Sequence, residues 1–168
     1  MVSIRIKVTV PKEKFADKHW VNTIADVMKT KTAPDLRREF LKTVFGWSAE
    51  KKPHFTRQLK RTSHSISMSV FDREEGDIYT LVNAGSPAHI ITPKKARGFL
   101  RFRTGYRSAT TPGSIQSRRA YRSGQFVGAR VVHHPGFEAR KFDELIAEDY
   151  YQTFVNDMQE AFERAARD

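Results

Sequence analysis

Hydrophobic and polar residues alternate strictly from residue 2 to residue 10. The hydrophobic positions are Val2, Ile4, Ile6, Val8 and Val10. Because successive side chains of a strand point to opposite faces, this period of two predicts a strand with one buried face. Pro11 ends that strand and can begin a helix, and hydrophobic residues then recur at helical spacing up to about Lys29.

A second helix is predicted from Thr32 to Gly46. Thr32 and Asp35 fit a capping box, and Pro34 lies in the first turn. The hydrophobic stripe of this helix consists of Leu36, Phe40, Leu41, Val44 and Phe45. Periodicity fades over residues 47–61, which predicts a connection.

Strand patterns resume in the middle of the chain. Hydrophobic residues alternate with serines over residues 65–70, and the run from Ile78 to Val82 predicts an antiparallel hairpin partner for them. In a further strand over residues 99–103, Arg101 and Arg103 point to the face opposite Leu100 and Phe102. Basic side chains therefore line one face of the predicted sheet.

A last strand is predicted over residues 125–133, and before it lies the long segment Gly105–Gly124. This segment is rich in Ser, Thr, Gly, Pro and Arg, and loops of this length are usually functional or disordered. We expect it to be mobile in the free subunit and to face DNA or a partner through Arg107, Arg118, Arg119 and Arg122. Helical spacing then continues from Ala139 to Ala165.

Together these elements predict an α+β fold in one domain over residues 1–168. We expect an N-terminal strand followed by two helices, a mainly antiparallel sheet of about five strands, and a long C-terminal helix packed on the sheet. The length of 168 residues is enough for one hydrophobic core. The basic loop at residues 105–124 belongs to this domain.

Charge divides the chain into two unequal parts. Residues 1–142 carry 28 Lys and Arg against 11 Asp and Glu, whereas residues 143–168 carry 2 against 8. No acidic residue occurs between Asp77 and Glu138. So basic a stretch attracts a polyanion or an acidic protein face, which predicts that a partner covers it.

The sequence offers little support for catalysis. There is no cysteine and no glycine-rich phosphate loop, and none of the six histidines is spaced as a helical metal pair. We therefore expect no metal and no cofactor. No hydrophobic run is long enough to cross a bilayer, and we expect no membrane partner.

One alternative is a basic nucleic-acid-binding protein, in which Phe99, Phe102, Tyr106 and Tyr121 stack on bases. A metal-independent ribonuclease is the enzymatic form of this alternative. In that form His89 or His134 acts as the general base, and Arg101 or Arg130 stabilises the transition state.

Two segments carry a resemblance to a known family. The first runs from Tyr79 to Phe102 and contains Gly85, Ser86, His89, Pro93 and Lys94; the second contains His134, Pro135 and Gly136 and leads to Phe142. In order and spacing they resemble the tail-completion (head-tail joining) proteins of long-tailed bacteriophages. Ser86 stands where that family usually has Thr. The glycines and prolines of the segments are expected to shape turns and to bind nothing.

This resemblance implies a structural virion protein without enzymatic activity. It implies a homo-oligomeric ring, as in the hexamers of related tails, that forms part of the neck or connector. The ring would join the tail tube or tail terminator protein to the head-completion proteins and let genomic DNA pass. Such a minor tail protein is made in the host cytoplasm and ends in the virion.

Overall fold

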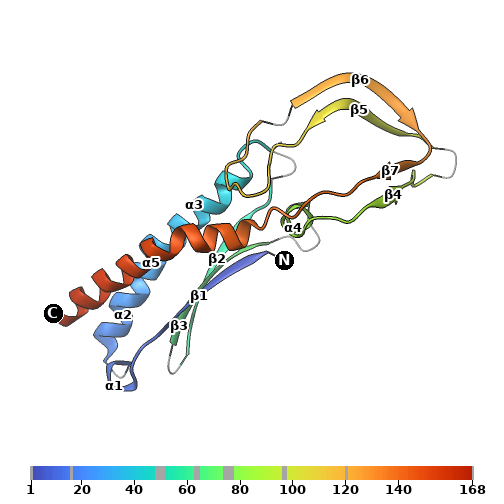
Figure 1. Cartoon of the computed structure of the whole chain (residues 1–168). Coiled ribbons are helices and arrows are strands. Elements are labelled where there is room, and N and C mark those ends of the chain that lie inside the picture. Colours follow the sequence, from blue (N-terminus) through green and yellow to red (C-terminus); the bar gives the residue numbers. More distant parts are fainter. Residues whose placement is uncertain are drawn as a thin grey trace.

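A computed structural model describes residues 2–15, 17–47, 52–62, 65–73, 78–95, 98–119 and 121–167. The chain forms a body, in which helices cover a sheet, and an arm that extends from one end of the body (Figure 1). The arm consists of residues 85–107 and 121–137, and the C-terminus lies at the opposite end of the molecule (Figure 1).

The body contains one antiparallel sheet. Its strands are β1 (Ser3–Thr9), β2 (Phe55–Arg61) and β3 (Ser65–Asp72), in the order β1-β3-β2. The alternation that predicted β1 and β3 is confirmed, because Ile66, Met68 and Val70 of the central strand are at most 1% exposed. Met68 pairs with Ile6 on one side and with Leu59 on the other.

Two sequence predictions for this sheet are wrong. The segment expected to be a connection contains β2, an edge strand in which only Phe55 is buried, so it has no periodic hydrophobic pattern. The run Ile78–Val82, expected to pair with β3, lies instead in a short helix, α4 (Ile78–Ala84). The strand β3 is paired with β1 on one edge and with β2 on the other, so neither edge of β3 is left for this run.

The predicted helices are present with different boundaries. The first is divided into α1 (Lys12–Phe15) and α2 (Lys18–Val27), because Asp17 caps α2 by accepting a hydrogen bond from the His19 amide at 2.8 Å. A π-helical turn, η1 (Met28–Thr32), then joins α2 directly to α3 (Ala33–Thr43).

The expected capping box at Thr32 is therefore wrong. Thr32 has helical dihedral angles and makes no capping hydrogen bond, and Asp35 forms an ion pair with Arg38 at 3.0 Å. Pro34 has no amide hydrogen, and its ring crowds the preceding helical turn. The wider π turn, in which the Ala33 amide donates to the Met28 carbonyl, lets the helix continue past Pro34.

The predicted C-terminal helix is confirmed as α5 (Phe142–Arg167). It packs chiefly on α2 and also contacts α3 and β1, so helices and sheet enclose one core (Figure 1). The most fully buried side chains of this core include Ile24, Leu36, Phe40, Ile66, Met68, Val70, Tyr79, Phe142 and Ile146. No described helix combines the length and apolar character needed to cross a bilayer.

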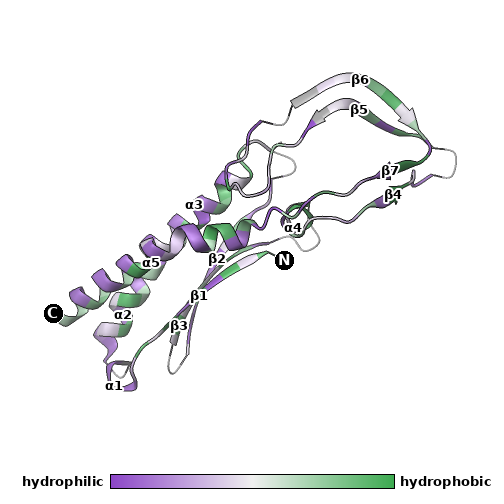
Figure 2. Cartoon of the chain, viewed as in Figure 1, coloured by the Kyte–Doolittle hydropathy of each residue, from purple (hydrophilic) through white to green (hydrophobic). Residues whose placement is uncertain are grey.

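The arm consists of two antiparallel ribbons. One pairs β4 (His89–Ile91) with β7 (Val132–His134), and the other pairs β5 (Leu100–Arg107) with β6 (Tyr121–Ala129). Each strand makes its main contacts with its own partner. Hydrophobic residues nevertheless occur along β6 and β7, away from the core (Figure 2).

The fold is thus α+β, as predicted, but the strands are divided among three sheets. One sheet has three strands and two have two strands, so the prediction of one sheet of about five strands is wrong. The predicted last strand is likewise divided between β6 and β7. Strand patterns are local, whereas membership in a common sheet depends on distant pairing.

Candidate functional site

Residues of the two motif segments meet where the arm leaves the body. Ser86 forms a bridge with Phe137, and their amides and carbonyls exchange two hydrogen bonds of 2.9 Å. Farther along, His89 pairs with His134, and their rings stack with centroids 4.9 Å apart. The strand pairing therefore joins segments that lie far apart in the sequence.

The histidines at this junction hydrogen-bond to the local backbone. His89 Nδ1 lies 2.9 Å from the Pro87 carbonyl and 3.3 Å from Ser86 Oγ, and His134 Nδ1 accepts a hydrogen bond of 3.0 Å from the Gly136 amide. These contacts orient both rings toward turns of the chain.

Gly136 allows the two motif segments to approach closely. Its φ of +81° lies in the left-handed region, and a Cβ atom at this position would clash with the Ser86 carbonyl oxygen. Pro135 precedes it and is exposed, and Pro93 and Lys94 follow β4, with Lys94 exposed. The turn therefore depends on the absence of a side chain at position 136.

Asn83 connects the base of the arm to α5 through hydrogen bonds, and the sequence analysis did not predict this role. Its Oδ1 accepts hydrogen bonds from the amides of Phe142 at 2.6 Å and Asp143 at 3.4 Å, and its Nδ2 donates to Asp143 Oδ1 at 2.9 Å. It therefore caps a helix to which it is not adjacent in sequence. No local spacing could have indicated this role.

An aromatic cluster lies beneath the same junction. The Tyr79 ring is stacked on Phe142 with centroids 5.5 Å apart and meets Phe55 edge-on at 5.1 Å. The Tyr79 hydroxyl accepts a hydrogen bond from Thr43 Oγ1 at 3.2 Å. Burial raises the pKa of Tyr79 well above its ordinary value, because the phenolate would lose its hydration. This cluster anchors α4 and the start of α5 to the core.

Arginine and phenylalanine side chains lie together on one face of the β5–β6 ribbon and at its end. Arg101 pairs with Gly128, and Arg103 pairs with Phe126, whose ring lies 4.3 Å from the Arg103 guanidinium carbon. The guanidinium carbon of Arg130 lies 5.3 Å from the Phe99 ring. We call Phe99, Arg101, Arg103, Phe126 and Arg130 the Arg/Phe face. It contains both sheet-face arginines predicted from the sequence.

The segment between β5 and β6 is shorter than predicted and contacts the body. The strands extend to Arg107 and begin again at Tyr121. Within the segment, Ser117 Oγ donates to the Lys42 carbonyl at 3.0 Å and accepts from the Gly46 amide at 2.9 Å. Ser117 therefore satisfies polar backbone groups at the C-terminal end of α3, a role that the sequence did not reveal.

Gly46 lies opposite this docked segment. The α3 helix ends at Thr43, and a Cβ atom at position 46 would clash with the Arg118 carbonyl oxygen. Gly46 thus permits close approach of the segment and does not itself end the helix.

The four arginines of the predicted loop lie at different places in the ribbon and in the segment that docks on α3. Arg107 ends β5, and Arg118 and Arg119 lie in the docked segment, all three exposed. Arg122 pairs with Tyr106 in the ribbon, but the side chains of Arg122, Tyr106 and Tyr121 lie outside the described part of the chain. The arginines therefore belong partly to strands and partly to the docked segment.

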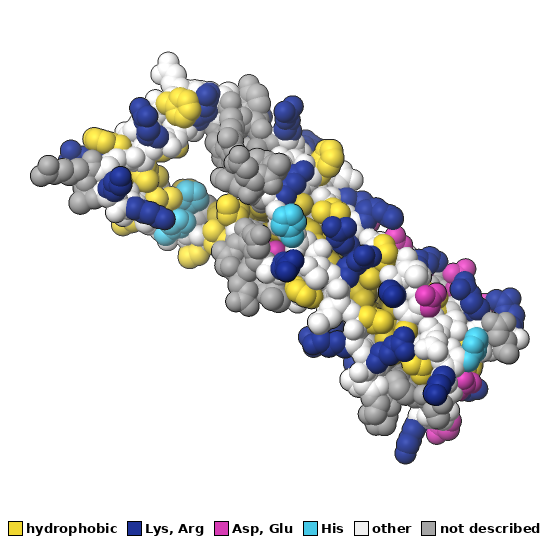
Figure 3. Space-filling view, turned by 180° about the vertical axis from the view of Figure 1, so that it is seen from behind, with side chains coloured by type: hydrophobic (Ala, Val, Ile, Leu, Met, Phe, Trp, Pro, Cys, Tyr) yellow, Lys and Arg dark blue, Asp and Glu magenta, His cyan; other side chains and the backbone are white. Residues whose placement is uncertain are grey.

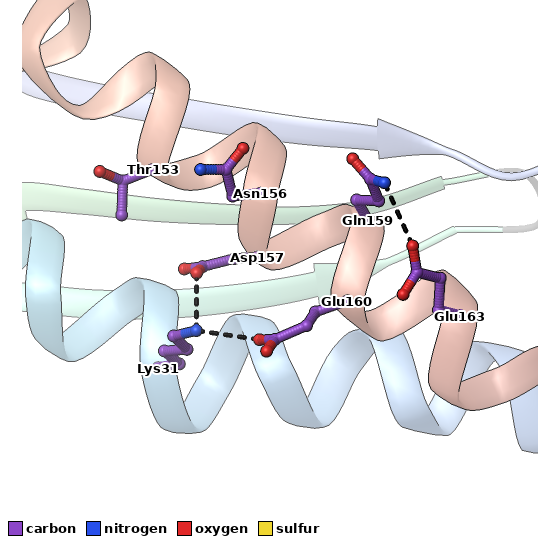
Figure 4. A pocket seen from close by; sticks show the side chains of 7 residues that line it. All are labelled: Lys31, Thr153, Asn156, Asp157, Gln159, Glu160 and Glu163. Carbon is purple, nitrogen blue, oxygen red and sulfur yellow. Dashed lines mark hydrogen bonds and ion pairs between the residues drawn. The ribbon is translucent and has the colours of Figure 1, made fainter.

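A polar pocket of about 470 Å³ lies on the opposite part of the molecule, between η1 and α5 (Figure 4). Lys31 Nζ lies there, 2.8 Å from Asp157 Oδ1 and 3.1 Å from Glu160 Oε2. Hydrogen bonds to both carboxylates raise the pKa of Lys31. Because Asp157 is 2% exposed and Lys31 balances its charge, we interpret this group as a structural ion pair.

The described residues include no cluster of three or more His, Asp or Glu side chains that could hold a metal ion. Comparison of the chain with family models, curated proteins and solved structures gives no match.

Proposed function

We propose that this chain is a structural assembly protein whose copies form a ring at the head-tail neck of a tailed bacteriophage. In this role it joins the tail tube or tail terminator to the head-completion proteins and surrounds the path of the DNA. The observation that carries the proposal is the arm, whose base is formed by the two segments that resemble tail-completion proteins.

The arm has no core of its own. None of the described side chains in residues 85–107 or 121–137 is buried. Large hydrophobic side chains are exposed there, with Ile90 at 61%, Phe99 at 59% and Phe126 at 67%. Isolated two-stranded ribbons are marginally stable in water, and contiguous exposed hydrophobic residues mark interaction sites. These features favour an arm that is covered by other subunits.

The charge distribution supports a head-to-tail arrangement of copies. Basic and hydrophobic side chains cover the arm, whereas the acidic side chains in view gather mainly at the other end of the molecule (Figure 3). Unlike surfaces on one subunit generate rings when the rotation between neighbours closes. A basic lumen would also suit the passage of DNA.

The test of this function has two parts. Purified protein should form closed rings in negative-stain images, and light scattering should give one oligomeric mass. In phage particles that contain the chain, a label at the C-terminus should appear at the neck. A protein that stays monomeric at high concentration and is absent from particles would contradict the proposal.

A nucleic-acid-binding role is the alternative, and the Arg/Phe face is the observation that favours it. Arginine and exposed aromatic rings can contact phosphates and bases together. Affinity for oligonucleotides should then fall steeply with salt, and charge reversal at Arg101 and Arg103 should flatten that dependence. Weak binding that is unaffected by this reversal would leave the assembly role as the better account.

A further inference from the structure

The Arg/Phe face lacks a partner within the arm. No Asp or Glu occurs from residue 78 to residue 137, so no acidic residue of the arm itself can neutralise these arginines. Arg103 and Arg130 are held over phenylalanine rings, which leaves the edges of their guanidinium groups open to acceptors. The face therefore presents hydrophobic rings and cationic edges together.

A surface of opposite character lies on α5. Glu144, Glu148, Tyr151 and Val155 follow the spacing i, i+4, i+7 and i+11, so they share one side of the helix. All four are exposed, and Tyr151 is 66% exposed and Val155 37% exposed. We call these four residues the acidic stripe. Ile146 and Asp157, which are buried, lie on the opposite side of the helix.

Of the two carboxylates of the acidic stripe, one forms an ion pair within the described part of the chain. Glu144 Oε2 lies 2.9 Å from Lys141 Nζ, which raises the pKa of Lys141. Glu148 forms no ion pair with any residue in the described ranges. An exposed tyrosine beside such carboxylates, as Tyr151 is, is typical of an interface anchor.

The face and the stripe match in chemistry and spacing. Alternate residues of a strand, such as Arg101 and Arg103, are separated by about 6.6 Å. Residues four apart on a helix, such as Glu144 and Glu148, are separated by about 6 Å. Two arginines can therefore meet two carboxylates while the phenylalanine rings cover Tyr151 and Val155. The acidic stripe thus offers both carboxylates for the arginines and a hydrophobic surface for the phenylalanine rings, within the same protein.

In one copy, the arm extends away from the body, and the acidic stripe lies on the first half of α5, on the body (Figure 1). Both surfaces are exposed, so both are available to neighbours. We propose that the Arg/Phe face of one copy packs on the acidic stripe of α5 in the next copy. This contact deepens the proposed ring function and rests on it, because it names the surfaces through which successive subunits join.

Cysteine cross-linking tests the contact directly, because the chain contains no cysteine. Phe126→Cys and Tyr151→Cys are made in separate, differently tagged chains, mixed and oxidised with copper phenanthroline. We expect a mixed disulfide between the two variants. A Gln58→Cys chain, exposed on β2, provides the matched control and should give only background cross-linking with Phe126→Cys.

Charge reversal gives an independent test. One double variant carries Arg101→Glu and Arg103→Glu, and the other carries Glu144→Lys and Glu148→Lys. Each should weaken the affinity of self-association by about tenfold or more. Mixing the two charge-reversed proteins should restore assembly between them. Circular dichroism and thermal unfolding monitor folding, and Glu148→Lys alone provides a milder variant that leaves the Lys141–Glu144 pair in place.

The outcomes separate this contact from the ring function. Closed rings without the mixed disulfide and without restoration would overturn the contact while the proposed function stands. The mixed disulfide in open filaments would support the contact and contradict the ring. Normal assembly of the Arg101→Glu, Arg103→Glu variant, combined with loss of oligonucleotide binding, would assign the face to nucleic acid and overturn the proposal.

Discussion

The side-chain oxygen of Asn83 accepts a hydrogen bond of 2.6 Å from the amide of Phe142, although the two residues lie in different helices. The Lys141 amide also donates to the Asn83 carbonyl at 3.1 Å, so both the side chain and the backbone of Asn83 hold the start of α5. This contact fixes the arm base relative to the core, because Phe142 is fully buried against Tyr79.

Replacing Asn83 with alanine should destabilise the protein. The change removes the cap of α5 and leaves the partly buried Phe142 amide without its acceptor, which should lower the free energy of unfolding by about 1–2 kcal/mol. Urea denaturation followed by circular dichroism measures this loss. Asn156→Ala is the control, because Asn156 is exposed and bonds only to Gln152 in the described structure, so an equal loss there would contradict the assigned role.

Gly46→Ala should detach the docked segment from α3. The added Cβ would clash with the Arg118 carbonyl, and separating the two would break the hydrogen bonds of Ser117. We expect a loss of about 1–3 kcal/mol and faster hydrogen exchange at the Ser117 amide. Gly128→Ala is the matched control, since the nearest atom to its Cβ lies 3.9 Å away. Equal effects of the two changes would argue against docking.

The arm base should depend on His134 more than on its neighbour His133. His134→Ala removes the ring stacked on His89 and the acceptor of the Gly136 amide, whereas His133 is exposed. Hydrogen exchange should therefore accelerate at β4 and β7 in His134→Ala, with the body sheet unchanged. His133→Ala should leave protection nearly as in the parent protein. The ribonuclease alternative requires that replacing His89 or His134 abolish RNA cleavage, so His134→Ala and a His89→Ala variant test it together.

Stability should fall at alkaline pH because of Tyr79. Burial raises its pKa in the folded protein above the value near 10 of an unfolded tyrosine, so the stabilising contribution is complete below about pH 10 and is lost as the pH rises beyond it. Burial acts in the same direction on the pKa of Tyr150. Absorbance at 295 nm and circular dichroism should therefore show tyrosinate formation and unfolding together.

Two substitutions test the source of this alkaline transition. Tyr79→Phe removes the ionisable group from the core, so unfolding should begin at a higher pH relative to the parent. Tyr151→Phe changes a ring that is 66% exposed and should leave the transition where it was. A transition that responds equally to both substitutions would contradict burial of Tyr79 as its cause.

The sequence by itself determined the elements whose signals are local. Hydrophobic residues recur every second position in β1 and β3 and at helical spacing in α5. These periods arise because the hydrophobic side chains face the core, so they can be recognised in the sequence. The sequence also shows directly that residues 78–137 contain basic but no acidic residues, and that the C-terminal segment is acidic. The arginines on one face of β5 follow from the period of two.

Only the tertiary structure decided how these elements combine. An edge strand such as β2 buries one residue and has almost no pattern, while the hydrophobic run at Ile78 became a helix because both edges of β3 were already paired. The separation of the ribbons from the body, the cap supplied by Asn83 and the docking of Ser117 join residues distant in sequence. Such contacts depend on the global arrangement of the chain, which no local period encodes.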